Sequence, residues 1–279
     1  MATDTLRSKN WLEYAWPVAH GALVAQLVQR DVLARYRQSW LGSSWIVLTP
    51  LLMLTIYVFV LGHVLQVRWG GAAGSAEAAS PTALALRLYA GLAVFGYLGE
   101  CVGRAPMLVV GQPHLVKKLV FPLGLLAWVN VLASLVPMAV AAALLLVMAM
   151  LQPGPWPVRL LLLPVAWLPL VPLGLGVSWL LAGLGAYVRD VGHAAGLAMS
   201  ALMFLSPIFY PMDALPAALQ PWLQLNPLAL PIEFTRSLVT VDALPSWTSY
   251  AVHLLACTAF AAGSAVLFHR LRAGFADVV

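Results

Sequence analysis

The sequence predicts an all-α protein that crosses a membrane several times. Hydrophobic residues make up 62% of the 279 residues and charged residues only 9%, whereas a soluble domain carries roughly 25% charged residues. Asp, Glu, Lys and Arg are absent from residues 38–67, 119–158, 160–188 and 243–269. A transmembrane helix needs about 20 predominantly apolar residues. These runs are too long for the strands of a membrane barrel and do not alternate with a period of two.

Six spans connected by short loops are expected. They are placed at residues 44–66, 83–103, 123–151, 159–187, 193–210 and 248–269. The chain is then one transmembrane domain over residues 1–279: an N-terminal cytoplasmic and interface segment at 1–42, a six-span core at 43–269 and a cytoplasmic tail at 270–279. This length leaves no room for a soluble catalytic domain.

Positive residues predict the orientation, because Lys and Arg are enriched in cytoplasmic loops. With the N-terminus inside, eleven of them are cytoplasmic: Arg7, Lys9, Arg30, Arg35, Arg37, Arg104, Lys117, Lys118, Arg189, Arg270 and Arg272. Four are external: Arg68, Arg87, Arg159 and Arg236. We therefore expect a multi-pass protein of the cell inner (cytoplasmic) membrane with both termini cytoplasmic. Its net charge of +5 reports this orientation and does not indicate nucleic-acid binding.

An amphipathic helix is expected before the first span. Its apolar stripe is formed by Leu23, Val24, Leu27, Val28, Val32 and Tyr36, and its polar side by Gln26, Gln29, Arg30 and Arg37. Such a helix lies along the membrane surface. Asp31 and Arg35 interrupt the stripe, but their i, i+4 spacing allows an ion pair. The helix is either a surface anchor or a docking surface for a cytoplasmic partner.

Residues 211–241 are apolar but cannot form one helix, because proline removes a hydrogen-bond donor and clashes with the preceding turn. The prolines are Pro211, Pro216, Pro221, Pro227 and Pro231. We expect two short re-entrant helices that form an outer gate, because irregular backbone at membrane depth is tolerated only beside protein or a water-filled path. The gate candidates are Pro211, Glu233 and Arg236, of which the last two are spaced i, i+3 and can pair.

The side chains needed for chemistry are missing from the sequence. The six histidines are scattered, and Cys101 and Cys257 lie in or beside apolar segments, which suggests neither a metal site nor a disulfide. Lys9, Lys117 and Lys118 are the only lysines, and none can complete a G-x-x-x-x-G-K-[ST] loop. Arg87 and Glu100, near opposite ends of the second span, are expected to be interfacial. We therefore expect a transport subunit that has no cofactor and is not an enzyme, with any ATP bound by a partner.

Several stretches resemble one family along nearly the whole chain. Arg30-Asp31 through Arg35-Tyr36-Arg37 to Leu41-Gly42, followed by Trp45 and Thr49-Pro50, is similar to the opening of type-2 ABC transporter permeases that export polysaccharides. Three later stretches agree with the family in the same order: residues 116–122, 187–191 and 206–211, with Leu225-Asn226-Pro227-Leu228 after them. Thr49 stands where Asn is commoner.

The resemblance implies a homodimer of six-span subunits, together with a homodimer of a separate ABC ATPase subunit. It also implies that the N-terminal helix and a short cytoplasmic helix between spans two and three couple the two. The coupling candidates are Arg30, Asp31, Arg35, Arg37, His114, Lys117 and Lys118. Lys117 and Lys118 can alternatively be simple membrane anchors, and the whole loop at 104–118 is the better candidate.

A polysaccharide path needs aromatic walls with few charges, because sugar faces stack on aromatic rings. The path candidates are Tyr57, Phe59, Phe95, Tyr97, Phe204, Phe209 and Tyr210, with lipid-facing or core packing as the alternative for each. The expected function is that of the permease of an ATP-driven exporter of lipid-linked polysaccharide, such as O-antigen or capsule. The alternatives are a teichoic-acid or small-molecule exporter of the same family, a secondary carrier, and an intramembrane enzyme or assembly factor.

Overall fold

The computed structural model describes residues 20–36, 40–64, 81–116, 122–152, 158–212, 216, 218, 220–240 and 242–275. Within these ranges the chain is helical and contains no strand. Arg37, Lys117 and Lys118, three of the coupling candidates, lie outside the described residues.

Five helical segments of the described chain are long and apolar enough to cross a membrane. They are Gly42–Val64, Thr82–Arg104, Leu125–Met150, Val158–Gly185 and Trp247–Gly274. The first comprises the turn Gly42–Ser44, α3 (Trp45–Tyr57) and a π-helical end at Val58–Val64. The second and third are α4 (Pro81–Arg104) and α7 (Leu125–Met150). The fourth comprises η5 (Val158–Leu162), α8 (Leu163–Trp167) and α9 (Leu170–Gly185). The last is α13 (Trp247–Leu271) with the turn Arg272–Gly274.

The expected fifth span differs from the prediction. Its helix, α10 (Val191–Leu205), has only 15 residues, so it is about 22 Å long against the roughly 30 Å of a hydrocarbon core. It ends because Ser206 is extended, with φ −95° and ψ 147°. Pro207 follows, and a residue before proline is pushed away from the helical region. Residues 206–210, which were expected to continue the helix, instead form turns.

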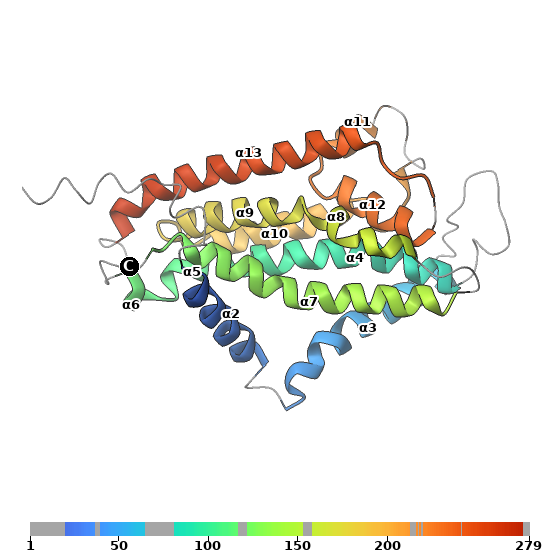
Figure 1. The fold of residues 1–279 in the computed structure, drawn as a ribbon, viewed down its shortest axis with the longest axis horizontal. Helices are drawn as coiled ribbons and strands as arrows, with labels where there is room; N and C mark the ends of the chain where they lie inside the picture. Colours follow the sequence, from blue (N-terminus) through green and yellow to red (C-terminus); the bar gives the residue numbers. More distant parts are fainter. Residues whose placement is uncertain are drawn as a thin grey trace, which may run out of the picture.

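The long helices run side by side along the longest axis of the molecule, whereas α2 (Gly21–Tyr36) and α3 splay away from this bundle (Figure 1). Two short helices, α5 (Met107–Val110) and α6 (Pro113–Val116), lie at the same end as α2. We call this end the α2 end. At the opposite end, the far end, lie α8, α11 (Gln220–Gln224) and α12 (Ala229–Thr240). The prolines of residues 211–241 predict two short helices in place of one long helix, and α11 and α12 lie there.

The amphipathic helix is present but its apolar side has a different partner from the one expected. Val24 is 3% exposed and packs in a small cluster with Leu125 and Val129 of α7. Part of the apolar stripe therefore covers another helix of the same subunit, while Leu33 remains 61% exposed. The helix is positioned by protein contacts as well as by its amphipathic character.

Glycines allow close packing between α9 and α13. A Cβ atom at Gly176 would lie 2.5 Å from the ring of Phe260, and one at Gly183 would lie 3.1 Å from Leu271. Without these side chains the two helices pack at short distance, as small residues commonly allow in membranes. Gly185 plays the same part at the α2 end, where α9 meets the turn after α4.

Replacing Gly185 with alanine is expected to destabilise the subunit. The new Cβ would lie 2.5 Å from the carbonyl oxygen of Pro106 and 2.9 Å from its Cα, and a clash with backbone cannot be relieved by rotating a side chain. Overpacking of this kind costs about 1–3 kcal/mol. Thermal unfolding in detergent should show a lower midpoint for Gly185→Ala. Gly263→Ala, where nothing lies within 4 Å, is the matched control, and equal midpoints for both variants would contradict the prediction.

Candidate functional site

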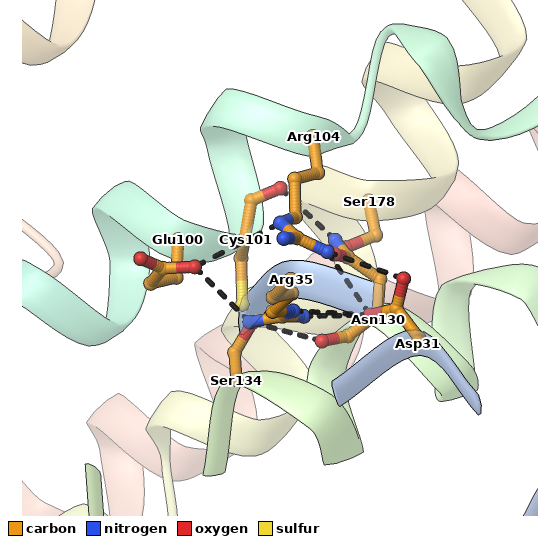
Figure 2. Close-up of polar contacts among 8 residues, drawn as sticks. All are labelled: Asp31, Arg35, Glu100, Cys101, Arg104, Asn130, Ser134 and Ser178. Atoms are coloured by element: carbon orange, nitrogen blue, oxygen red, sulfur yellow. Dashed lines mark hydrogen bonds and ion pairs between the residues drawn. The ribbon is translucent and has the colours of Figure 1, made fainter. Parts of the chain in front are cut away.

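Four charged side chains form a closed ring at the α2 end (Figure 2). Arg35 donates to Asp31 at 2.8 Å through Nη2 and to Glu100 at 3.1 Å through Nη1. Arg104 Nη1 lies 3.0 Å from the Asp31 carboxylate, and Arg104 Nε lies 3.8 Å from Glu100. Two acids and two bases thus alternate around what we call the ionic ring, and their formal charges cancel.

The ionic ring follows from two identical spacings. Asp31 and Arg35 are four residues apart on α2, and Glu100 and Arg104 are four residues apart on α4. Side chains at i and i+4 share one helix face, so each helix presents a ready pair. The expected Asp31–Arg35 pair is confirmed. The partner pair on α4 was missed, although the acid-before-base spacing at the end of the second span was a signal for it.

Burial makes the ionic ring stronger than an exposed ion pair. The Arg35 side chain is only 5% exposed, whereas Asp31 and Arg104 are 35% and Glu100 43% exposed. An exposed pair contributes about 0–1 kcal/mol, while a hydrogen bond to a charged group with less solvent competition contributes about 1.5–3 kcal/mol. The contacts of Arg35 are therefore the least open to competition from solvent at the arginine side.

A buried amide supports the ionic ring from within the bundle (Figure 2). Asn130 on α7 is 2% exposed, and its Nδ2 donates to the carbonyl of Cys101 and to Oγ of Ser178, both at 3.0 Å. Ser134 Oγ donates to the backbone carbonyl of Asn130 at 2.8 Å. Asn130 thus joins α4, α7 and α9 at the residue that follows Glu100, and it holds the turn of α4 that presents the ring.

The segment that continues from Arg104 contains the short helices α5 and α6. α5 packs on α7 and α9. His114 on α6 is exposed, as is Arg30 on α2, and neither belongs to the ionic ring. Of the described coupling candidates, Asp31 and Arg35 belong to the ionic ring, whereas Arg30 and His114 are exposed and lie outside it.

The aromatic path candidates form no single lining. Tyr57 and Phe204 lie against Phe209, with ring centroids 5.2 and 6.2 Å apart, and the Tyr210 hydroxyl donates to the Phe204 carbonyl at 3.0 Å. Exposed Phe59 stacks on His63 at 6.0 Å. Phe95 and Tyr97 pack in the hydrophobic core, where Tyr97 is 2% exposed.

A second polar cluster joins α12 to the chain after α10 at the far end. Arg236 is 5% exposed and donates to Glu233 at 2.5 Å, which confirms the expected i, i+3 pair. It also donates to the carbonyl of Pro207 at 2.5 Å. Asn226 Nδ2 donates to Oγ of Ser206 at 2.9 Å and to the carbonyl of Leu205. We call this set the far-end cluster; Pro211, the third gate candidate, is half-buried beyond it.

The far-end cluster brings together two stretches noted in the sequence, around Ser206 and around Asn226. A glycine assists it, because a Cβ at Gly91 of α4 would lie 3.3 Å from the backbone of Ile208. Ile208 is fully buried. Both stretches were noted only as family motifs, and the contacts of Pro207 and Asn226 were not predicted, because they depend on how the chain turns after α10.

Among the described residues no group of three or more His, Cys, Asp or Glu side chains is arranged to hold a metal ion. Both cysteines are free and buried. The described polar contacts connect helices to one another. The ionic ring joins α2 to α4 at the α2 end, and the far-end cluster joins α12 to the chain after α10.

Five long apolar helices, with a ring of paired charges at one end, define a multi-pass membrane protein over the described part of the chain. A family model described as ABC-2 type transporter matches residues 22–240, from α2 to α12. The chain belongs to this family, as its motifs predicted. Its matched region is a membrane transport domain, and members of the family pair with an ABC ATPase subunit.

Three curated relatives carry the name O-antigen export system permease protein RfbA. One from Myxococcus xanthus is 27% identical over 209 residues, which cover 74% of this chain and 75% of that protein. Two from Klebsiella pneumoniae are 25% identical over 225 residues and 23% identical over 261 residues. These alignments cover 77% and 92% of this chain and 79% and 95% of the relatives.

Proposed function

We propose that this chain is the permease of an ATP-driven exporter that moves a lipid-linked polysaccharide, of the O-antigen or capsular type, across the cytoplasmic membrane. Three relatives named as O-antigen export permeases support the choice of cargo. The observation that carries the mechanism is the ionic ring, which ties the helix before the first span to the end of α4. In this proposal ATP binding in the partner moves α5 and α6, and the ring passes that movement to α2.

The proposed membrane arrangement has six spans in one domain over residues 1–279. α10 serves as a short fifth span, and α11 and α12 form a re-entrant pair that dips into the bilayer and acts as an outer gate. The α2 end and residues 1–42 and 270–279 are cytoplasmic, and residues 43–269 form the membrane core. The positive residues support this orientation, because most of them fall on the α2 side.

Reporter tags test the orientation. Tags at either terminus or after His114 should report a cytoplasmic position, and tags near Gly74 and Pro153 an external one, because the cytoplasmic side then holds eleven of the fifteen Lys and Arg residues. Paired reporters, one active only inside and one only outside, provide the control. An external report from either terminus would reverse the orientation and remove the proposed site for the ATPase.

We further propose that two copies assemble around the path. The span Gly42–Val64 has only 6% of its most apolar stretch buried within the subunit, against 56% for Thr82–Arg104. α10 is also largely exposed. Tyr57 of α3 contacts Phe209, which follows α10 and contacts Phe204. These three residues and Tyr210 are the aromatic residues best situated to contact sugar. Membrane lipid covers the rest of the bundle.

Export assays separate this function from its alternatives. Deleting the partner ATPase should abolish appearance of the polymer outside the cell, whereas collapsing the proton gradient while ATP is maintained should leave export intact. The reverse pattern would indicate a secondary carrier. If export in a reconstituted system requires ATP but accepts a small molecule or a teichoic acid and not a lipid-linked glycan, the cargo assignment fails while the transporter class stands.

A further inference from the structure

A groove of about 570 Å³ lies between α7 and the η5–α8 part of the fourth span. Its α7 side combines three alanines, Ala139, Ala142 and Ala143, with the larger Leu135, Met138 and Leu146. Its other side includes Leu163 and Trp167. The alanines hollow out one wall, because a longer side chain at any of them would fill the space.

A break in the fourth span forms the second wall. Its helix is interrupted by a turn at Leu168 and Pro169, between α8 and α9. Pro164 lies in the first turn of α8, where a proline is tolerated because that turn needs no backbone donor. The fourth span is therefore divided into two helices, α8 and α9, at Leu168 and Pro169.

The groove has an almost entirely apolar lining. Every lining side chain is hydrophobic, and the one polar group among them, the indole N–H of Trp167, donates to Oγ1 of Thr235 at 2.9 Å. A hollow without hydrogen-bonding groups does not hold ordered water. Leu161 and Leu168 on its rim are 78% and 50% exposed, so the groove opens outward, where the bilayer supplies alkyl chains.

A positive charge stands at the far-end rim. Arg159 directly precedes the lining residues Leu160 and Leu161 and is exposed. Its Nη1 donates to the carbonyl of Asp242 at 3.0 Å, which holds the side chain near the surface. A guanidinium has five N–H donors and a geometry suited to phosphate, and long basic side chains near helix ends reach toward the headgroup layer.

We propose that the groove between α7 and α8 binds one acyl chain of an anionic phospholipid whose phosphate contacts Arg159. Charge complementarity favours such a lipid over a neutral one. A second copy of the subunit is the poorer occupant, because the least buried spans are Gly42–Val64 and Trp247–Gly274, at 6% and 22%. The two walls of the groove belong to spans that are 33% and 56% buried. The site is independent of the identity of the exported cargo.

Photolabelling tests the site in the full-length subunit with its ATPase partner, reconstituted in nanodiscs. The probes are phosphatidylglycerol and phosphatidylcholine with a diazirine near the end of one acyl chain, and labelled peptides are mapped by mass spectrometry. In the wild-type protein, phosphatidylglycerol should label the α7 and α8 peptides several-fold more than phosphatidylcholine does. Labelling of α3, α10 and α13 at the same level as α7 and α8 would overturn the proposal. This outcome needs no variant, so it does not depend on whether a variant folds.

Two substitutions separate the chain from the headgroup. Ala142→Phe fills the groove and should reduce labelling there several-fold, whereas Ala251→Phe, on the exposed face of α13, should leave it unchanged. Arg159→Gln should retain labelling but lose the preference for phosphatidylglycerol. Unchanged labelling in Ala142→Phe or an unchanged preference in Arg159→Gln would refute the site. So would efficient disulfide formation between copies carrying Leu161→Cys, since that would place a second subunit at the groove.

Discussion

Replacing Arg35 with glutamate is expected to reduce ATP-driven export by about tenfold to a hundredfold. The side chain is only 5% exposed and contacts both Asp31 and Glu100. The variant places a third carboxylate beside those two, so the attraction that holds α2 against α4 becomes repulsion. Hydrogen bonds to a charged group contribute about 1.5–3 kcal/mol. Losing them shifts the equilibrium between docked and undocked α2 by about tenfold to a hundredfold, because each factor of ten corresponds to about 1.4 kcal/mol.

Export and permease-stimulated ATP hydrolysis are the measurements, with co-purification of the ATPase as a third. Arg270→Glu is the matched control, because it reverses one exposed charge at the same end of the bundle. The variant subunit should still reach the membrane. Unchanged export and unchanged co-purification in Arg35→Glu would mean that the ionic ring only anchors α2 and does not couple the permease to the ATPase.

A charge exchange makes the test specific for contact between the helices. Asp31→Arg combined with Arg35→Asp keeps the net charge and the i, i+4 pair on α2, but it sets like charges against Glu100 and Arg104. Export should fall. Adding Glu100→Arg and Arg104→Glu restores alternation around the ring and should recover most of the export. If the four-residue exchange is no better than the two-residue exchange, the helices are not coupled through these charges.

Replacing Arg236 with leucine is expected to destabilise the far end by about 1.5–3 kcal/mol, the usual contribution of hydrogen bonds to a charged group. The Arg236 side chain is only 6% exposed, whereas its partner Glu233 is 29% exposed and is partly solvated when the arginine is removed. Here Glu233 would lose its contact at 2.5 Å, and the carbonyl of Pro207 would lose a donor. α12 would then separate more readily from the chain that follows α10. The thermal midpoint of the purified subunit should fall, and Arg236→Lys, which keeps the charge, should fall less.

Cysteine accessibility reports the same change locally. Leu228 is fully buried and Leu225 is 74% exposed, so an impermeant thiol reagent should label Leu225→Cys rapidly and Leu228→Cys slowly. Adding Arg236→Leu should accelerate labelling at position 228 alone. If this segment is an outer gate, trapping the transporter with ATP should also change labelling at 228. Equal labelling at both positions in every state would mean an ordinary surface loop.

Much of the site and fold could be predicted because the signals are local. An uncharged stretch of some 20 residues requires a spanning helix wherever its neighbours lie, and five of the expected spans are long apolar helices. The pairs Asp31–Arg35 and Glu233–Arg236 form within one helix, at spacings of four and three residues. The prolines of residues 211–241 likewise act on their own backbone, and two short helices result.

What tertiary structure alone decided depends on residues distant in sequence. Arg35 meets Glu100 across 65 positions, and Arg104 meets Asp31 across 73. The ionic ring therefore forms only when α2 packs on the bundle, and of its two i, i+4 pairs only Asp31–Arg35 was predicted. The Pro207 carbonyl reaches Arg236 because α10 ends at Leu205, earlier than its apolar composition suggested. Tyr97, which was expected to line a path, is buried in the core because residues of other helices pack against it. Composition determines which segments enter the bilayer, but because apolar side chains suit both lipid and protein, only packing decides which faces meet.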